Sequence, residues 1–136
     1  MKNVVVVISA HPDDETLGAG GTLLKHKSKG DILYWIIGTK MTNQKNKYSN
    51  DMIESRQKEI KKVSEAFGFS NVFQLDYETT ELNSGSLKTL IPEISKIFST
   101  IKPNIIYNVN INDAHSDHQF ISKAVFASSK TFDTPS

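Results

Sequence analysis

The sequence predicts an α/β fold in which helices cover both faces of a mainly parallel sheet. Four short runs rich in β-branched and aromatic residues recur along the 136-residue chain, and amphipathic segments separate them. Strands that alternate with helices form parallel sheets through right-handed crossovers. The length suits one compact domain and is too short for two of usual size, so residues 1–136 are expected to form a single domain.

The four apolar runs are the expected strands. They span residues 3–9 (NVVVVIS), 32–38 (ILYWIIG), 72–76 (VFQLD) and 104–110 (NIIYNVN). The first two lack the alternation of polar and apolar residues that marks a strand with one solvated face. Continuous β-branched runs are instead typical of parallel strands that are buried on both faces.

The amphipathic segments are the expected helices, at residues 16–29, 51–67 and about 87–101. The third has the clearest pattern, because its apolar residues recur at steps of three and four. Gly30, Gly68 and Pro103 stand where the helices are expected to end. Pro92 suits the first turn of the third helix better than its middle. The elements together predict a Rossmann-like, three-layer α/β/α fold.

Composition narrows the class of partner. The formal net charge of +1 gives no support to a nucleic-acid or membrane-surface role, so a small-molecule partner is expected. The absence of cysteine excludes disulfides and thiolate metal sites, which leaves His, Asp and Glu as the strong metal ligands. No apolar run approaches the ~20 residues of a membrane span. We therefore expect a cytoplasmic protein.

Two polar clusters follow the first and the fourth expected strand. "AHPDDE" occupies residues 10–15 and "DAHSDH" occupies residues 113–118. In a doubly wound sheet of order 3-2-1-4 these strands are neighbours, and ligand sites gather at the carboxyl ends of such strands. Two imidazoles and a carboxylate bind zinc while leaving positions open for water and substrate. The clusters therefore predict a catalytic metal site.

Each cluster taken alone has a plainer interpretation. Acidic residues and serine near a helix N-terminus can cap the helix and complement its dipole. However, three of the four histidines lie in the two clusters, beside paired aspartates, which favours a shared site. The fourth, His26, is expected on the polar side of the first helix, in contact with solvent. The glycines of "GAGG" at residues 18–21 lack the spacing of a dinucleotide-binding loop.

Four segments carry a resemblance to a known family. "AHPDDETLGAGGTLLK", "ESRQKEIKKVSEAFGF", "IKPNIIYNV" and "HSDH" together resemble the PIG-L/LmbE-type family of zinc-dependent N-acetylglucosaminyl deacetylases. The resemblance runs along nearly the whole chain. It implies that one zinc ion is bound by His11, Asp14 and His118.

The resemblance also implies roles for four further residues. Asp13 matches the general base of the family, His115 the histidine that stabilises the oxyanion or acts as the acid, and Asp117 its orienting partner. Arg56 occupies the position of an arginine that reaches the substrate. Its plainer interpretation is a surface ion pair with Glu59 on the same helix.

The implied function is hydrolysis of the N-acetyl group of an N-acetylglucosamine-type substrate by zinc-activated water. Members of the family act on phosphatidylinositol-linked sugar and on sugar precursors of thiols. Three alternatives stay open: a metal-binding α/β fragment without turnover, an amidase that acts on a sugar–thiol conjugate, and a phosphoesterase. Assays that compare acetamides, bulkier amides and phosphate esters distinguish the hydrolases.

The chain departs from the family in length. Family domains continue well beyond "HSDH", whereas this chain stops at Ser136, so it resembles an N-terminal portion that lacks the C-terminal strands. The fourth strand is then expected to present an unpaired edge. Such an edge would allow the chain to associate as a homo-oligomer.

Overall fold

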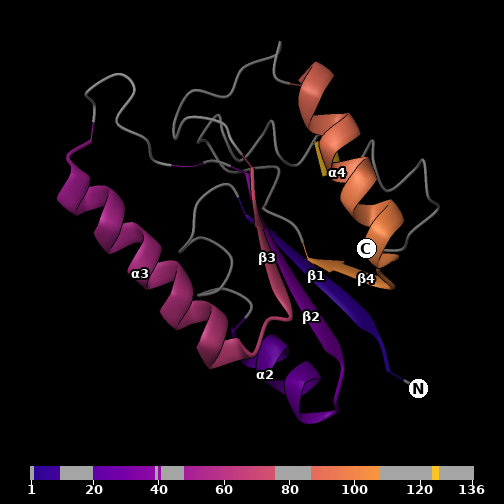
Figure 1. The fold of residues 1–136 in the computed structure, drawn as a ribbon. Coiled ribbons are helices and arrows are strands. Elements are labelled where there is room, and N and C mark those ends of the chain that lie inside the picture. The colour runs from indigo at the N-terminus through magenta and orange to yellow at the C-terminus, as the bar shows by residue number, and fades with distance from the viewer. Residues whose placement is uncertain are drawn as a thin grey trace.

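A computed structural model gives the architecture for residues 2–9, 20–38, 40, 48–75, 87–107 and 124–125. Strands and helices alternate along these residues (Figure 1). In chain order they are β1 (Val4–Ser9), α2 (Gly20–Ser28), β2 (Ile32–Ile37), α3 (Asn50–Phe67), β3 (Asn71–Gln74), α4 (Leu87–Ile101) and β4 (Ile105–Tyr107).

The four strands form one parallel sheet in the order β3-β2-β1-β4. β1 lies in the middle and pairs with β2 over its whole length, from Val4 opposite Ile32 to Ser9 opposite Ile37. On its other side β1 pairs with β4, where Val7 lies opposite Tyr107. The predicted fold class and strand order are therefore confirmed.

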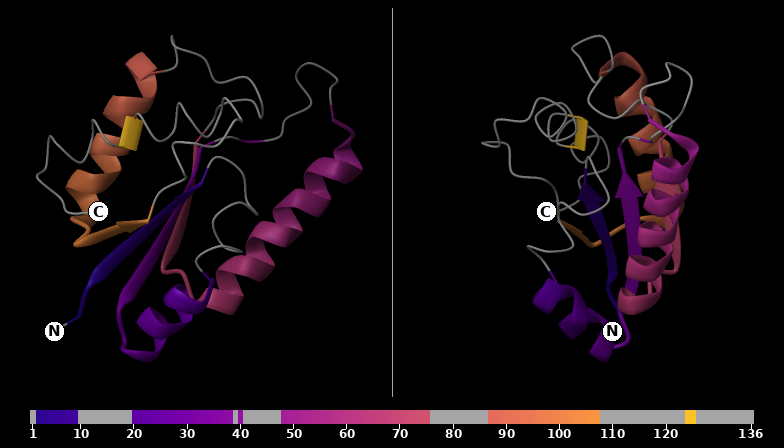
Figure 2. Two further views of the ribbon diagram at one scale, coloured as in Figure 1. Left: turned by 180° about the vertical axis from the view of Figure 1, so that it is seen from behind. Right: turned by 90° about the vertical axis from the view of Figure 1, so that its left-hand side faces the viewer.

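Helices cover both faces of the sheet (Figure 2). On one face, Val5 and Val7 of β1 pack with Leu23 of α2 and Ile60 of α3. On the other face, the intervening side chains of β1 pack against α4 and the buried residues 124 and 125. The valine run of β1 lacks polar alternation because both of its faces contribute to a core.

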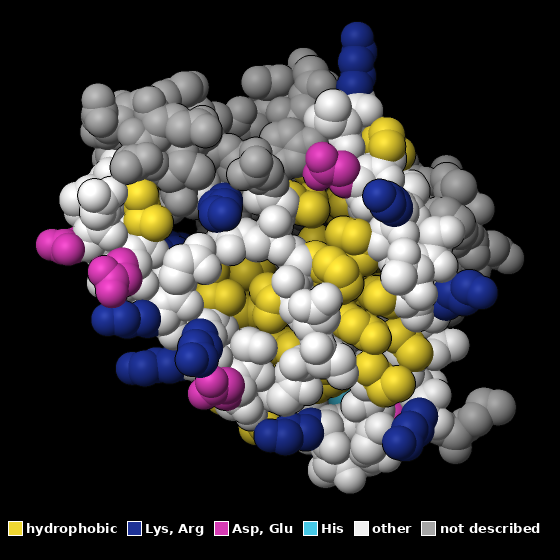
Figure 3. All heavy atoms as spheres, viewed as in Figure 1, with side chains coloured by type: hydrophobic (Ala, Val, Ile, Leu, Met, Phe, Trp, Pro, Cys, Tyr) yellow, Lys and Arg dark blue, Asp and Glu magenta, His cyan; other side chains and the backbone are white. Residues whose placement is uncertain are grey.

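Hydrophobic side chains also show at the edge of the sheet formed by β3. In the space-filling view they gather between α3 and α4 (Figure 3). Tyr34 of β2 and Phe73 of β3 are half-buried and contact each other, with ring centroids 6.0 Å apart. Ile91 and Ile97 of α4 are also half-buried in this cluster.

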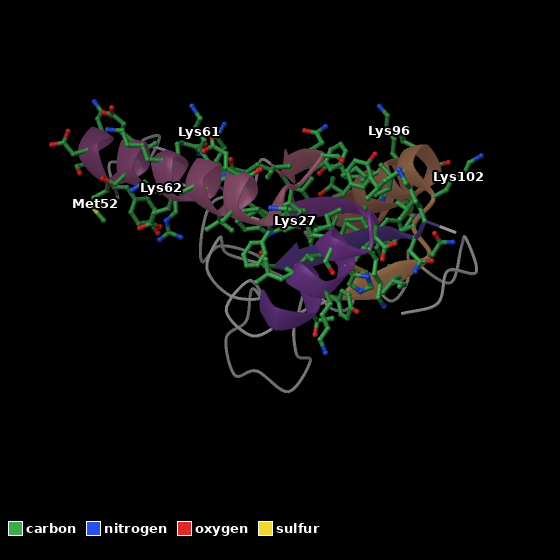
Figure 4. The ribbon with its side chains drawn as sticks, turned by 90° about the horizontal axis from the view of Figure 1, so that it is seen from below. Lys27, Met52, Lys61, Lys62, Lys96 and Lys102 are labelled. Carbon is green, nitrogen blue, oxygen red and sulfur yellow. The ribbon has the colours of Figure 1, made fainter. Side chains whose placement is uncertain are left out.

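Capping interactions define both ends of α3. The hydroxyl of Ser49 accepts a hydrogen bond from the backbone N–H of Met52 at the start. Gly68 ends the helix in the left-handed conformation, with φ +69°, and its N–H donates to the carbonyl of Ser64. Beside this end, Lys27 of α2 donates to the carbonyl of Ala66 over 3.2 Å (Figure 4). A glycine and a cation at a helix C-terminus are the expected stop signals.

The predicted element bounds agree with the structure to within a few residues. The helix expected at residues 87–101 has those bounds in the structure, and α3 begins one residue before its expected start. Pro92 lies in the second turn of α4 rather than the first, so the carbonyl of Lys88 lacks the usual helical N–H partner. The expected extensions at residues 16–19 and 108–110 lie outside the described residues.

Candidate functional site

β1 and β4 lie side by side in the sheet (Figure 1), and Tyr107, the last described residue of β4, lies opposite Val7, two residues before the end of β1. β1 ends at Ser9 and the description of β4 ends at Tyr107. The segments that carry the two polar clusters follow directly after these residues in the sequence. The structure therefore bears out the expected adjacency of the two strands from which the clusters depart.

The cluster residues themselves lie outside the described part of the chain. This applies to the expected metal ligands His11, Asp14 and His118, and to the expected catalytic residues Asp13, His115 and Asp117. Their roles stay predictions. Within the described residues, no group of three or more His, Cys, Asp or Glu side chains could hold a metal ion.

Buried hydrogen bonds fix the end of β1. The indole N–H of Trp35 donates to the hydroxyl of Ser9 over 3.0 Å, and both side chains are fully buried. The carbonyl of Ser9 accepts from the N–H of Gly38 over 2.8 Å. The strand is thus held in place up to the residue that precedes "AHPDDE".

Arg56 lies in the second turn of α3, with 24% of its side chain exposed. It lines an open hollow of about 290 Å³ together with Asp51, Met52, Ser55 and Glu59. Its Nε atom is 3.9 Å from a carboxylate oxygen of Glu59, at the outer limit of an ion pair. The surface ion pair of the plainer interpretation is thus present, although it is long and pairs of this kind contribute little to stability. The substrate role of Arg56 stays a prediction.

A pair of glutamines near Arg56 did not emerge from the sequence. Gln57 of α3 donates its amide to the side-chain oxygen of Gln74, the last residue of β3, over 3.2 Å. The amide nitrogen of Gln74 is buried and has no hydrogen-bond partner among the residues that the structure describes. Buried polar groups are rarely left unpaired. This nitrogen is therefore a hydrogen-bond donor at the carboxyl edge of the sheet. The sequence feature that could have indicated it is the position of Gln74 directly after two apolar residues of the expected strand.

His26 is not solvated, so the prediction for it is wrong. It is 8% exposed, and its Nδ1 atom lies 2.7 Å from a carboxylate oxygen of Asp31. Its Nε2 atom lies 2.8 Å from the hydroxyl of Tyr107. The polar side of α2 is covered because Asp31, which precedes β2, and Tyr107 of β4 both supply a partner for the imidazole.

The carboxyl group of Asp31 is held in its charged form. The backbone N–H of Asn3 donates to one carboxylate oxygen over 3.0 Å and lowers the pKa of Asp31 below its ordinary value of 3.8. The hydrogen bond from His26 and the charges of His26 and Lys29 lower the pKa further, while burial opposes the shift. An ionised carboxylate accepts hydrogen bonds only, so Nδ1 of His26 carries the proton between the two side chains.

No helix among the described residues is long and apolar enough to cross a membrane.

A comparison with protein families finds one whose pattern matches residues 6–129, described as "PIG-L: GlcNAc-PI de-N-acetylase". Two curated relatives are similar to the chain. One is a probable N-acetyl-alpha-D-glucosaminyl L-malate deacetylase 2 from Bacillus cereus, which is 29% identical over 92% of this chain and 60% of its own length. The other is a diacetylchitobiose deacetylase from Thermococcus kodakarensis, which is 27% identical over 85% of this chain and 45% of its own length. The chain thus spans about half the length of these relatives.

Solved structures share the fold. An N,N'-diacetylchitobiose deacetylase from Pyrococcus horikoshii superposes with a TM-score of 0.80 at 21% identity, covering 94% of this chain and 49% of the other. A conserved protein from Thermus thermophilus superposes with a TM-score of 0.78 at 22% identity, covering 94% of this chain and 56% of the other. These likenesses show that the chain shares the fold of the solved structures.

Proposed function

Because the chain belongs to the PIG-L family of GlcNAc-PI de-N-acetylases, we propose that it removes the N-acetyl group from an N-acetylglucosamine-type substrate. The observation that carries the proposal is the parallel pairing of β1 with β4. Because the two strands are parallel neighbours, the segments of both polar clusters follow β1 and β4 on the side of the carboxyl edge. Ligands bind at such an edge in doubly wound folds.

One zinc ion is the proposed cofactor, bound by His11, Asp14 and His118. The donor set fits this metal, because two imidazoles and one carboxylate are typical of catalytic zinc sites. A zinc ion in such a site polarises an amide carbonyl and lowers the pKa of water. The chain has no cysteine, so a thiolate site is not an alternative.

The remaining cluster residues supply the proton transfers of amide hydrolysis. Asp13 accepts a proton from the attacking water. His115 stabilises the negative charge that develops on the carbonyl oxygen and donates a proton to the nitrogen, so that the amine can leave. Asp117 orients His115 by accepting a hydrogen bond from its ring. The products are acetate and the free amino sugar.

Arg56 is the proposed substrate contact on α3. It lines a hollow that is open to solvent and large enough for part of a sugar conjugate. Gln57, the next residue, contacts the end of β3, which places this turn of α3 beside the carboxyl edge. The two curated relatives are named for deacetylation of a glucosaminyl malate and of diacetylchitobiose. We infer a small N-acetylglucosamine conjugate as the class of substrate.

Zinc binding tests the proposed site. The chain is stripped with a chelator, and zinc binding is measured by calorimetry for the native chain, His118→Ala and His115→Ala. We expect near-stoichiometric binding by the native chain, loss of binding in His118→Ala, and retained binding in His115→Ala. The His115 variant is a matched control because it removes the same side chain from the same segment without removing a proposed ligand.

Acetate release then tests the reaction. N-acetylglucosamine conjugates are compared with bulkier amides and with phosphate esters. Release of acetate from the conjugates alone supports the deacetylase. Zinc binding without any acetate release would identify a metal-binding chain without turnover, and preference for a bulkier amide or a phosphate ester would identify a different hydrolase.

A further inference from the structure

Met52 and Leu24 are the two large apolar side chains that stay exposed among the described residues. Met52 of α3 is 49% exposed and Leu24 of α2 is 51% exposed. A single exposed apolar side chain is ordinary on a protein surface. The two differ in their surroundings, because Met52 lines the hollow beside Arg56, and Leu24 is not among the described residues that line it.

Met52 lies on the side of α3 that faces the core. Met52, Arg56 and Ile60 follow one another at steps of four along the helix, so they are neighbours on one side of it. Ile60 is buried in the core, and the side chain of Arg56 is 24% exposed. In Figure 4, Met52 projects from the side of the helix opposite to Lys61. The core-facing side of α3 thus continues as far as Met52.

The sheet ends before α3 does. Gln57 contacts Gln74, the last residue of β3, so the turns of α3 that precede Gln57 lie beyond the end of this strand. Figure 1 shows that α3 and the sheet diverge toward this end of the helix. The apolar side chain of Met52 therefore projects from the core-facing side of the helix at a level where no described strand packs against it.

The hollow combines apolar and polar groups. Its volume of about 290 Å³ is near the lower end of the range for pockets that hold small molecules, so it suits part of a ligand. Met52 supplies an apolar wall, Ser55 a hydroxyl, Arg56 a cation, and Asp51 and Glu59 carboxylates. A methionine side chain is flexible and adapts to apolar surfaces of different shape. The lining therefore suits a ligand part that has hydroxyl groups and an apolar face.

We propose that Met52 forms the apolar wall of a subsite for the aglycone, the group attached to N-acetylglucosamine. It favours conjugates in which an aromatic or pyranose ring follows the sugar over conjugates with a short, wholly polar aglycone. This inference rests on the proposed function, because Arg56 beside Met52 is the proposed substrate contact. The ring packs on Met52 in the bound substrate and in the transition state alike, so the contact lowers KM and leaves kcat unchanged.

Acetate release from the phenyl and the methyl β-glycoside of N-acetylglucosamine tests the subsite. Both substrates are compared in the native chain, Met52→Gln, Met52→Leu and Leu24→Gln. Glutamine keeps the length and helix propensity of methionine, and it keeps the backbone N–H that donates to the hydroxyl of Ser49. Leu24→Gln is the matched control, because it places the same residue at the other exposed apolar position, on a different helix.

In the native chain we expect KM to be about fivefold lower for the phenyl than for the methyl glycoside, the change that corresponds to burial of about 40 Å² of apolar surface. Met52→Gln should bring the two KM values within about twofold of each other, with kcat unchanged. Met52→Leu keeps an apolar wall and should keep most of the difference. Leu24→Gln should keep all of it.

Three results would overturn the proposal while deacetylation stands. They are equal KM values for the two glycosides in the native chain, an unchanged preference in Met52→Gln, and an equal loss of preference in Leu24→Gln. Release of acetate from neither glycoside would instead contradict the proposed function.

A binding measurement decides the role of Met52 in that case as well. The methyl groups of the three methionines are labelled with ¹³C, and the signal of Met52 is assigned by its absence from Met52→Gln. The phenyl glycoside should shift this signal and the methyl glycoside should not. A signal of Met52 that stays unchanged with the phenyl glycoside would show that the ring does not pack there.

Discussion

Trp35 and Ser9 join β2 to the last residue of β1 through a hydrogen bond of 3.0 Å between two fully buried side chains. The indole N–H can only donate, and the serine hydroxyl is its acceptor. Because Ser9 directly precedes "AHPDDE", this bond fixes the point at which the first cluster leaves the sheet.

Ser9→Ala is expected to lower the free energy of unfolding by about 1–3 kcal/mol, because it leaves the indole N–H of Trp35 buried without a partner. Urea unfolding followed by circular dichroism, which does not depend on the single tryptophan of the chain, measures the loss. In a Trp35→Phe background the donor is absent, so Ser9→Ala should cost clearly less there. Equal losses in both backgrounds would show that the hydrogen bond is not the cause.

Asp31→Asn is expected to change how stability depends on pH. The N–H of Asn3 and then His26 hold the pKa of Asp31 below 3.8, so below about pH 4 the unfolded chain takes up a proton that the folded chain does not. The stabilisation from Asp31 is therefore fully present at neutral pH and declines as the pH falls through this range. The difference in free energy of unfolding between the native chain and Asp31→Asn should shrink from about pH 5 to pH 3.

Urea unfolding at several pH values between these limits measures the difference. Glu65→Gln removes one negative charge from the exposed face of α3 and serves as the control. A difference between the native chain and Asp31→Asn that stays constant with pH would contradict the assignment of Asp31 as a carboxylate with a lowered pKa.

Gly68→Ala is expected to lower the free energy of unfolding by about 1–2 kcal/mol, because a residue with a Cβ atom is strained at φ +69°. The added Cβ would also lie 3.3 Å from Cε of Lys27, a flexible side chain that can move. Gly30→Ala is the matched control, since Gly30 has φ +82° and its nearest contact is at 3.8 Å. Similar losses in both variants, measured by urea unfolding, would assign the effect to the backbone, and a larger loss at Gly68 would assign the excess to Lys27.

The core of the fold could be predicted from the sequence because its signals are local. The valine run of β1 and the isoleucine-rich β2 are apolar on both faces, which identifies central parallel strands before any pairing is known. The stop signal at Gly68 is equally local, because a left-handed C-cap favours glycine. The strand order then followed from the general behaviour of doubly wound sheets.

The environment of His26 could not be predicted in this way. Its partners lie five and 81 residues away, and neither separation is a helical repeat. Local periodicity assigns the residue to the polar side of α2, but it does not indicate which residues pack on that side. The same limit applies to Gln57 and Gln74, whose contact between a helix and a strand end depends on how α3 lies along the sheet.

Arg56→Gln is expected to leave the free energy of unfolding within about 0.5 kcal/mol of the native value, since its ion pair with Glu59 is long and exposed. If Arg56 contacts substrate, the variant should show a raised KM for acetate release from an N-acetylglucosamine conjugate. Glu59→Gln breaks the same ion pair and keeps the arginine, so it should leave KM unchanged. A KM raised equally in both variants would mean that the ion pair, rather than contact with substrate, is responsible.

Asp13→Asn separates proton transfer from metal binding within the first cluster. If Asp13 is the general base, an amide in its place cannot accept the proton of water, and turnover should fall by about 10²–10⁴-fold. Zinc binding should persist, because Asp13 is not a proposed ligand.

Asp14→Asn is the neighbouring control, and it should weaken zinc binding because a carboxylate ligand is replaced by a neutral amide. Calorimetry for zinc and an acetate-release assay are made on both variants. Equal loss of zinc in the two would show that the adjacent carboxylates share one task, and the division into base and ligand would then be wrong.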